Sequence, residues 1–159
     1  MTHEALYSVE REYPVPVKRL WRAWTDPAEL EQWYSPVALA VVPGSVVSDV
    51  KLGGHWKIAV DVPEHAFVAY FWGRFSDVVP ERRLEHSLFY SQEEAEFVLA
   101  DESGEYHVIS VDFEPRGEQA AWVRFSQFGN MPAEQVEATQ LGMESYFDNL
   151  ERYLESNPA

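Results

Sequence analysis

The sequence predicts an α+β fold in which a curved antiparallel sheet of about seven strands wraps around a long C-terminal helix. Three observations predict it: apolar and polar residues alternate along several short stretches, turn-forming residues separate these stretches, and the C-terminal segment changes to helical spacing. A length of 159 residues is typical of one domain, and 46% hydrophobic residues suffice for one substantial core. We therefore interpret residues 1–159 as a single domain.

The N-terminal region predicts one strand and then two short helices. Between Ala5 and Tyr13, side chains alternate with the period of two that a strand requires. From Val17 the apolar residues recur at helical spacing, and Thr25-Asp26-Pro27 supplies a cap with proline at the first helical position. The second helix is expected to run from about Pro27 to Tyr34.

Six further strands are predicted between this region and the C-terminal helix. They are expected over residues 46–52, 55–62, 66–79, 84–90, 106–113 and 120–128. Gly53-Gly54 predicts a tight connection between the first two, and Gly73 predicts a bulge or bend in the third. The acidic stretch 92–96 is interpreted as a solvated loop or a short helical turn.

The C-terminal helix is predicted over residues 132–154. Its apolar stripe comprises Val136, Met143, Tyr146, Phe147, Leu150, Tyr153 and Leu154. Acidic residues occupy its other faces, so the stripe is expected to pack against the concave side of the sheet. One strand, two short helices, six strands and a long helix form the helix-grip arrangement.

Composition excludes several classes of partner and location. Asp and Glu number 27 against 12 Lys and Arg, a net charge of −15 that repels nucleic acids and anionic membranes. Without cysteine there is no disulfide, thiol nucleophile or thiolate metal site. The sequence shows no signal peptide and no apolar run of about 18 residues. We predict a cytoplasmic protein without nucleic-acid or membrane partners.

The sequence offers no set of catalytic or metal-binding residues. Its five histidines lack metal-ligand spacing, and no serine, histidine and acid combine into a recognisable nucleophile. Gly53-Gly54 lacks the further glycines of a nucleotide-binding loop. We therefore predict no metal, no cofactor and no assigned catalytic residue.

Several motifs, in order, resemble one family. The run Tyr13-Pro14 to Trp33, with Thr25-Asp26-Pro27 inside it, is similar to that family's proline-helix-"tDP"-helix-"W" opening. The "D…GG.W" hairpin, the "G…PP.RL" stretch and the "GW…LD.L..YL" ending are matched by residues 49–56, 73–84 and 142–154. The family is the heat-shock-protein-90 ATPase activator (Aha-type) family of the START-like, or SRPBCC, superfamily. Met143 departs from a common tryptophan, and Ala120 from a usual threonine.

The resemblance implies a cavity between the curved sheet and the long helix, which this superfamily uses for lipids, hormones, polyketides and other apolar molecules. It does not supply one reaction, since a fold alone does not fix function. The candidate binding residues are Trp33, Trp56, Phe71, Phe75, His86, Trp122, Arg124, Met143, Tyr146 and Phe147. For each aromatic residue in this set, packing in the core is the competing interpretation.

Three candidates have more specific alternatives. Arg124 shares a strand face with Trp122, and it either faces the cavity and binds a ligand carboxylate or pairs with an acidic neighbour at the surface. His86 is either a polar partner or proton shuttle in the cavity or a buried structural side chain. Trp33 is a candidate gate at the cavity mouth.

Three functions follow as hypotheses. The first is binding of a small, mainly apolar or amphipathic molecule, with one or two polar groups fixing its orientation. The second is a cyclase- or hydratase-like enzyme that uses the same cavity, with His86 or a tyrosine as acid or base. The third is a chaperone-interacting module. The absence of a motif that assembles two catalytic groups favours binding, and a homodimer is a further expectation.

Overall fold

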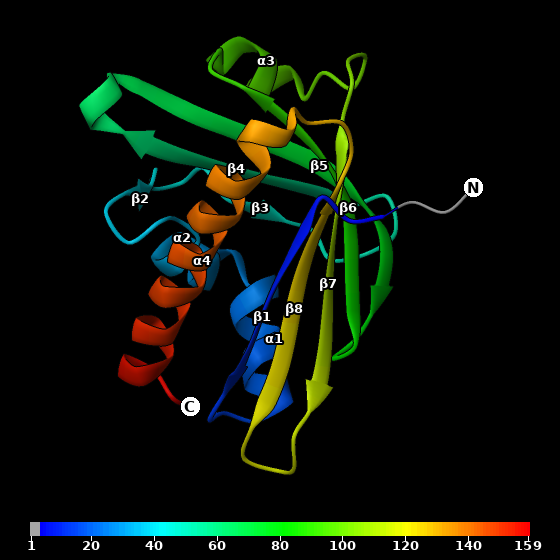
Figure 1. Ribbon diagram of the computed structural model, residues 1–159, viewed down its shortest axis with the longest axis vertical. Coiled ribbons are helices and arrows are strands. Elements are labelled where there is room, and N and C mark those ends of the chain that lie inside the picture. The colour runs from blue at the N-terminus through cyan, green and yellow to red at the C-terminus, as the bar shows by residue number, and fades with distance from the viewer. Residues whose placement is uncertain (1–3) are drawn as a thin grey trace.

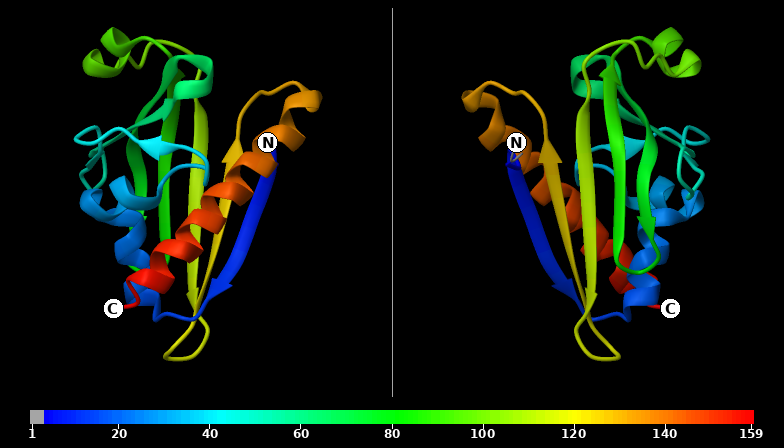
Figure 2. Two further views of the ribbon diagram at one scale, coloured as in Figure 1. Left: turned by 90° about the vertical axis from the view of Figure 1, so that its left-hand side faces the viewer. Right: turned by 90° about the vertical axis from the view of Figure 1, so that its right-hand side faces the viewer.

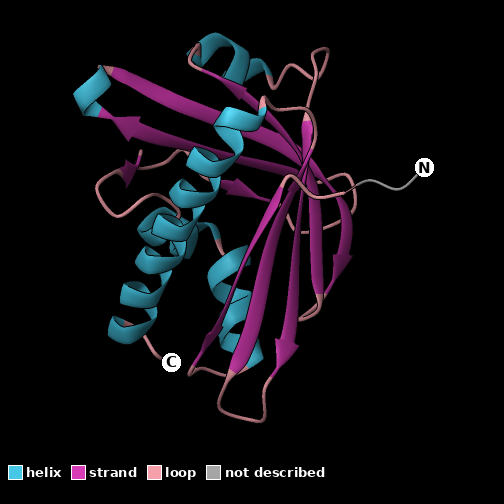
Figure 3. Cartoon of the chain, in the orientation of Figure 1, coloured by secondary structure: helices cyan, strands magenta, loops and turns pink. Residues whose placement is uncertain are grey.

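A computed structural model, which describes residues 4–159, shows a strongly curved antiparallel sheet with a long helix along its concave side (Figures 1 and 3). The strands are β1 (Tyr7–Tyr13), β2 (Ala40–Val41), β3 (Val47–Ser48), β4 (His55–Val62), β5 (Phe67–Val79), β6 (Arg83–Ser91), β7 (His107–Pro115) and β8 (Ala121–Phe128). The helices are α1 (Val17–Thr25), α2 (Pro27–Trp33), α3 (Glu94–Leu99) and α4 (Ala133–Ser156), with a 3-10 helix, η1 (Pro63–His65). The predicted α+β helix-grip fold is confirmed.

The strands follow the order β1-β8-β7-β6-β5-β4-β2, with β3 paired to β4. The chain returns from the far edge to pair β8 with β1, so the first strand lies beside the last. The sheet curves until β1 and β8 stand on one side of α4 and β4 to β6 on the other (Figure 2). This curvature places the concave faces of most strands around a single volume.

Side-chain alternation decides which residues occupy that volume. On β1 the predicted face is confirmed, since Tyr7, Val9 and Tyr13 are buried while Ser8 and Glu10 are exposed. On β8, where the sequence left both faces open, the inward face carries residues 121, 123, 125 and 127. Adjacent strands are in register, so these side chains form rows across the sheet.

The two short helices cover one end of the sheet with aromatic rings. Asp26 caps α2 as predicted, because its carboxylate accepts a hydrogen bond from the amide of Ala28 at 2.9 Å. Trp24 and Trp33 pack edge to face with ring centroids 4.8 Å apart. The indole of Trp33 donates to the carbonyl of Ala23 at 2.8 Å, and its side chain is fully buried. Trp33 is therefore a core residue, and the prediction that it gates the cavity mouth is wrong.

Helix α4 is packed into the core only along its C-terminal part. Its buried residues are Met143, Phe147, Leu150 and Leu154, whereas residues 133–142 include none. Long-range polar contacts show the same division: Arg11 binds Asp148 at 2.7 Å, and Tyr13 donates to the carbonyl of Phe147 at 2.9 Å. The N-terminal third of α4 thus extends beyond the close-packed core.

Some strand and helix limits differ from those predicted. The strand expected over residues 46–52 pairs only at Val47–Ser48, because the chain turns from Asp49 to Gly54 before it enters β4. Strand β2 is two residues long, too short for any alternation to predict it. Within the stretch expected as a loop or helical turn, α3 forms and continues to Leu99, covering the outer face of the sheet through Phe97 and Trp72.

Gly73 is required for a close approach and not for a bulge. A Cβ atom there would lie 1.8 Å from the carbonyl oxygen of Ser87 on β6, so only glycine fits. A bulge was predicted at Gly73, but the irregularity in the pairing of the long strand β5 with β6 lies a few residues later, between Phe75 and Asp77.

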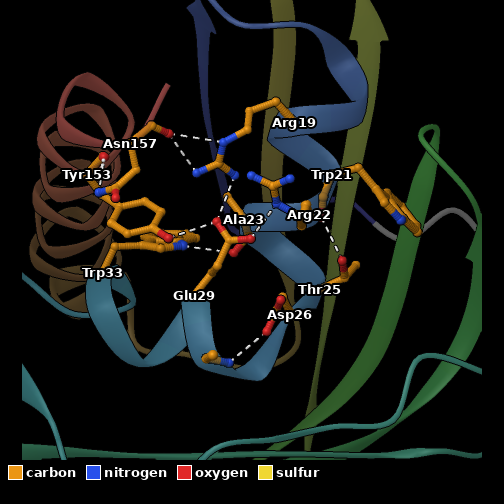
Figure 4. Close-up of polar contacts among 11 residues, drawn as sticks. Arg19, Trp21, Arg22, Ala23, Thr25, Asp26, Glu29, Trp33, Tyr153 and Asn157 are labelled. Atoms are coloured by element: carbon orange, nitrogen blue, oxygen red, sulfur yellow. Dashed lines mark hydrogen bonds and ion pairs between the residues drawn. The ribbon is translucent and has the colours of Figure 1, made fainter. Parts of the chain in front are cut away.

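A buried ionic cluster joins the two short helices to the end of α4 (Figure 4). The carboxylate of Glu29 binds Arg19 and Arg22, each at 2.7 Å, and accepts a hydrogen bond from Tyr153 at 2.8 Å. Arg19 also donates to the carbonyl of Asn157 at 2.8 Å. Burial favours a higher pKa for Glu29, but hydrogen bonds from Tyr153, Arg22 and Arg19 outweigh it and lower the pKa.

The substitution Glu29→Gln is expected to destabilise the fold by roughly 2–4 kcal/mol, because it leaves Arg19 buried without its partner. A carboxyl with a lowered folded-state pKa stabilises above its unfolded pKa, and this stabilisation is lost as the pH falls through the folded value. Urea unfolding at pH 7 and pH 3 measures both effects, with the exposed Glu137→Gln as control. A loss equal to that of the control would contradict the prediction.

Candidate ligand-binding cavity

A cavity of about 660 Å³ lies between the concave face of the sheet and the N-terminal half of α4. Its sheet wall is formed by inward side chains of β1 and of β4 to β8, namely Tyr7, Trp56, Phe71, Leu88, Tyr90, His107, Ile109, Phe125 and Gln127. Tyr34 follows α2, and α4 contributes Gln135, Thr139, Gly142, Met143 and Tyr146. Residues 105, 106 and 129–132 complete the lining. The volume is within the usual range for small-molecule sites.

One set of polar groups in the wall is internally paired. The Tyr7 hydroxyl donates to the side-chain oxygen of Gln127 at 2.6 Å, and the amide nitrogen of Gln127 lies 2.7 Å from Nδ1 of His107. Nε2 of His107 lies 3.0 Å from the carbonyl oxygen of Asn130. These distances fit a neutral imidazole that accepts at Nδ1 and donates from Nε2. The set fixes the side chains of β1, β7 and β8 in one arrangement.

Two further tyrosines, Tyr34 and Tyr146, line the cavity. The rings of Tyr34 and Tyr146 meet edge to face, with centroids 5.1 Å apart, and Tyr34 also packs on Trp56 at 5.7 Å. Burial raises the pKa of both phenols above the ordinary value. Both groups therefore remain protonated at neutral pH and can donate hydrogen bonds.

The cavity lining carries little charge. Among the lining residues of the described chain there is no lysine or arginine, and Glu105, which is exposed, is the sole carboxylate. This contrasts with the surface, where the net charge of −15 resides. The interior thus provides apolar contact area and neutral hydrogen-bonding groups.

Of the ten predicted candidates, four line this cavity: Trp56, Phe71, Met143 and Tyr146. Phe75 and Phe147, like Trp33, are buried in the core beside it, and Phe147 has no exposed surface. For these three, the competing interpretation of core packing describes their positions. The aromatic stripe alone does not separate wall from core, because both lie on the same face of the sheet.

Arg124 and Trp122 lie on the outer face of the sheet, so the placement of this cation in the cavity is wrong. The guanidinium lies 3.5 Å from a carboxylate oxygen of Asp112 on the neighbouring strand and 5.3 Å from the ring centroid of Trp122. This arrangement matches the alternative prediction, in which Arg124 pairs with an acidic neighbour at the surface. The basis for expecting a ligand carboxylate at Arg124 is removed.

His86 faces the concave side but lies outside the main cavity. Its ring stacks on Trp56 at a centroid distance of 4.3 Å, and Nδ1 lies 2.7 Å from the carbonyl of Ser87. It lines a separate space of about 10 Å³, too small for an organic ligand. Burial lowers the pKa of His86 to about 4, so the imidazole is neutral at physiological pH. This environment matches a structural histidine.

Sequence reasoning missed most of the polar residues of the wall, among them Tyr7, Tyr34, His107 and Gln127. Tyr7 lay on the correctly predicted inner face of the first strand, and Gln127 on the face of β8 that proves to be inward. A glutamine opposite a tyrosine among inward apolar residues was the available signal. Tyr34 follows the end of α2, where no periodicity assigns a direction to a side chain.

Between residues 4 and 159, no group of three or more His, Cys, Asp or Glu side chains is placed to hold a metal ion. Over the same residues, no helix combines the length and apolar character needed to cross a bilayer.

Comparison with known proteins identifies the family. Residues 14–155 match the family model described as "Activator of Hsp90 ATPase homolog 1-like protein". The chain belongs to this family. The match spans the elements from the end of β1 to the last turn of α4, and it confirms the resemblance found in the sequence motifs. No curated protein matches the sequence.

Solved structures share the fold of this activator-like chain at low sequence identity. An AHSA1 protein from Silicibacter pomeroyi has a TM-score of 0.79 at 20% identity, covering 95% of this chain and 98% of that one. A protein from Arthrobacter aurescens has a TM-score of 0.75 at 22% identity, covering 98% and 90%. DynU16, from the dynemicin biosynthetic locus, has a TM-score of 0.68 at 19% identity, covering 94% of this chain and 47% of that one. These similarities establish the fold.

The buried imidazole of His86 predicts a pH-dependent stability. Because the folded-state pKa of about 4 lies below the ordinary value of 6.5, the unfolded chain binds the proton better. Stability is complete above pH 6.5 and declines towards pH 4, by roughly 3 kcal/mol. We expect His86→Gln to remove this part of the decline in urea unfolding between pH 7.5 and 4.5. An equal stability difference between variant and wild type at both pH values would refute the assignment.

Proposed function

We propose that this protein binds a small, mainly apolar molecule in the cavity between the curved sheet and α4. The observation that carries the proposal is the cavity of about 660 Å³, whose walls are formed largely by aromatic and aliphatic side chains. Each 100 Å² of apolar ligand surface buried there would contribute about 2.5 kcal/mol. A ligand that filled much of the volume would gain enough to offset the cost of association.

The anchoring of α4 at its C-terminal part, which leaves open space under its N-terminal part, supports a binding role. The C-terminal part of α4 is held by buried residues and polar contacts, while residues 133–142 have no buried side chain. Gly142 lines the cavity, and a Cβ atom there would meet no atom within 4 Å. Interiors are normally close-packed. Unfilled space beside a glycine, under a helix anchored elsewhere, is therefore a favourable place for a ligand.

The two alternative functions make different demands on the molecule. A cyclase- or hydratase-like enzyme would need an acid or base within reach of the cavity, and the tyrosines meet this requirement better than His86, which lies outside it. A chaperone-interacting module would act through the outer surface and would leave the cavity without a role. We propose a cytoplasmic binding protein without nucleic-acid partners, on the basis of its acidic composition.

Mass spectrometry of a denatured extract of the purified protein is expected to identify a co-purified apolar compound. A ligand that binds only the folded state raises stability by RT ln(1 + [L]/Kd), so adding that compound should raise the melting temperature with dose. An empty extract together with a flat thermal-shift screen of apolar and amphipathic compounds would contradict the proposal. A complex with the chaperone of the host, in that case, would favour the third hypothesis.

Filling the cavity from α4 is expected to abolish binding without loss of stability. In Gly142→Trp the indole occupies the open space beside this residue, and the loss of a helical glycine favours the helix by a few tenths of a kcal/mol. Leu141→Trp is the matched control, because Leu141 is 64% exposed and does not line the cavity. Thermal unfolding and ligand titration measure both variants. Undiminished binding in Gly142→Trp would place the ligand elsewhere.

A further inference from the structure

The polar groups around the cavity fall into two classes. Tyr7, Gln127 and His107 satisfy one another, as described above. The hydroxyls of Tyr34 and Tyr146, by contrast, have no hydrogen-bond partner among residues 4–159. A hydroxyl oxygen without a partner is either buried or accessible to solvent. The buried, unpartnered side-chain atoms of the described residues do not include these two oxygens, so both oxygens retain accessible surface. Tyr34 is only 6% exposed, and both residues line the cavity.

The two tyrosines lie next to each other in the cavity wall. They come from different elements, the end of α2 and the middle of α4, and their rings contact each other at 5.1 Å. A buried O–H donor without an acceptor costs more than an unused lone pair on the same oxygen. An oxygen with two lone pairs, such as that of a carbonyl group, is the simplest partner for two neighbouring donors.

The charge of the surroundings limits the ligand further. No lysine or arginine of the described lining is available to a ligand carboxylate or phosphate, and Arg124 lies on the outer face. A ligand ammonium would find aromatic rings, but Glu105, the sole carboxylate of the described lining, is exposed to solvent. Burying an unpaired charge is costly, whereas a neutral oxygen satisfied by hydrogen bonds is not.

We infer that the ligand is uncharged and presents a carbonyl-type oxygen to the hydroxyls of Tyr34 and Tyr146, with its apolar body along the rings of Trp56 and Phe71. This inference rests on the proposed binding function and specifies its ligand class. It excludes apolar acids and amines of the same size. It also gives the tyrosine pair a role that core packing does not require, because phenylalanine would fill the same space.

The test uses compounds that differ only in one group. On a naphthalene and on an n-octyl skeleton, the hydrocarbon, the methyl ketone, the carboxylate and the trimethylammonium derivative are compared by displacement of N-phenyl-1-naphthylamine, an uncharged fluorescent probe. We expect the ketone to bind about tenfold tighter than the hydrocarbon, as one good neutral hydrogen bond allows. The two charged compounds should bind more weakly than the ketone.

Two variants assign the effect to the tyrosine pair. Tyr34→Phe and Tyr146→Phe should each weaken ketone binding by up to tenfold and leave hydrocarbon binding unchanged, which also shows that the cavity is intact. Tyr70→Phe is the control, since that hydroxyl contacts Glu94, outside the cavity lining. The inference would be overturned if all compounds of a series bound with equal affinity, or if a charged compound bound most tightly. It would also be overturned if both variants kept the wild-type preference for the ketone. In each case the proposed binding function would remain. If neither probe nor compounds bind, the proposed function fails.

Discussion

The division of α4 into an anchored part and a free part is the constraint on which the rest of the structure depends. From residue 143 onward the helix supplies four buried side chains to the core and makes polar contacts with β1, α1 and α2. A helix is stiff, so fixing one end also fixes the direction of the other. The first ten residues of α4 are thereby held over the sheet with no fully buried side chain, although Val136 contacts the core, and the cavity lies beneath them.

The anchor combines apolar burial with a few charged groups placed where helices end. Phe147 and Leu150 are fully buried, so truncating either would leave a void that the rigid surroundings fill poorly. Glu29, Arg19 and Tyr153 hold α1, α2 and the C-terminal turn of α4 together. A buried ionic group is weak evidence of net stability, but it permits one arrangement of partners, and here that arrangement sets the helix direction. The arrangement of the anchor therefore helps to determine the shape of the cavity, which the anchored part of α4 touches only through Met143 and Tyr146.

Sequence alone predicted the fold well because its signals are redundant. The alternation on β1, the cap at Asp26 and the apolar stripe of α4 each specify their element independently, and ordered motifs confirmed the arrangement. Short pairings such as β2 depend on where neighbouring chains meet and leave no periodic pattern. Gly73 correctly indicated a position that requires glycine, but the sequence could not separate a close approach to Ser87 from a bulge, because both favour the same residue type.

The site was harder to predict because wall and core share one face of the sheet. Phe71 and Phe75 lie on the same strand with the same inward orientation, yet Phe71 lines the cavity and Phe75 packs against His86. Phe71 and Phe75 differ in their position relative to the residue at which α4 begins to pack into the core. This position depends on long-range packing, which a local sequence pattern does not predict. Polar groups are more informative here, since a buried hydroxyl with no protein partner has a cost that packing does not explain. Under the proposed function, the hydroxyls of Tyr34 and Tyr146, which have no partner among residues 4–159, therefore narrow the class of ligand more than the surrounding rings do.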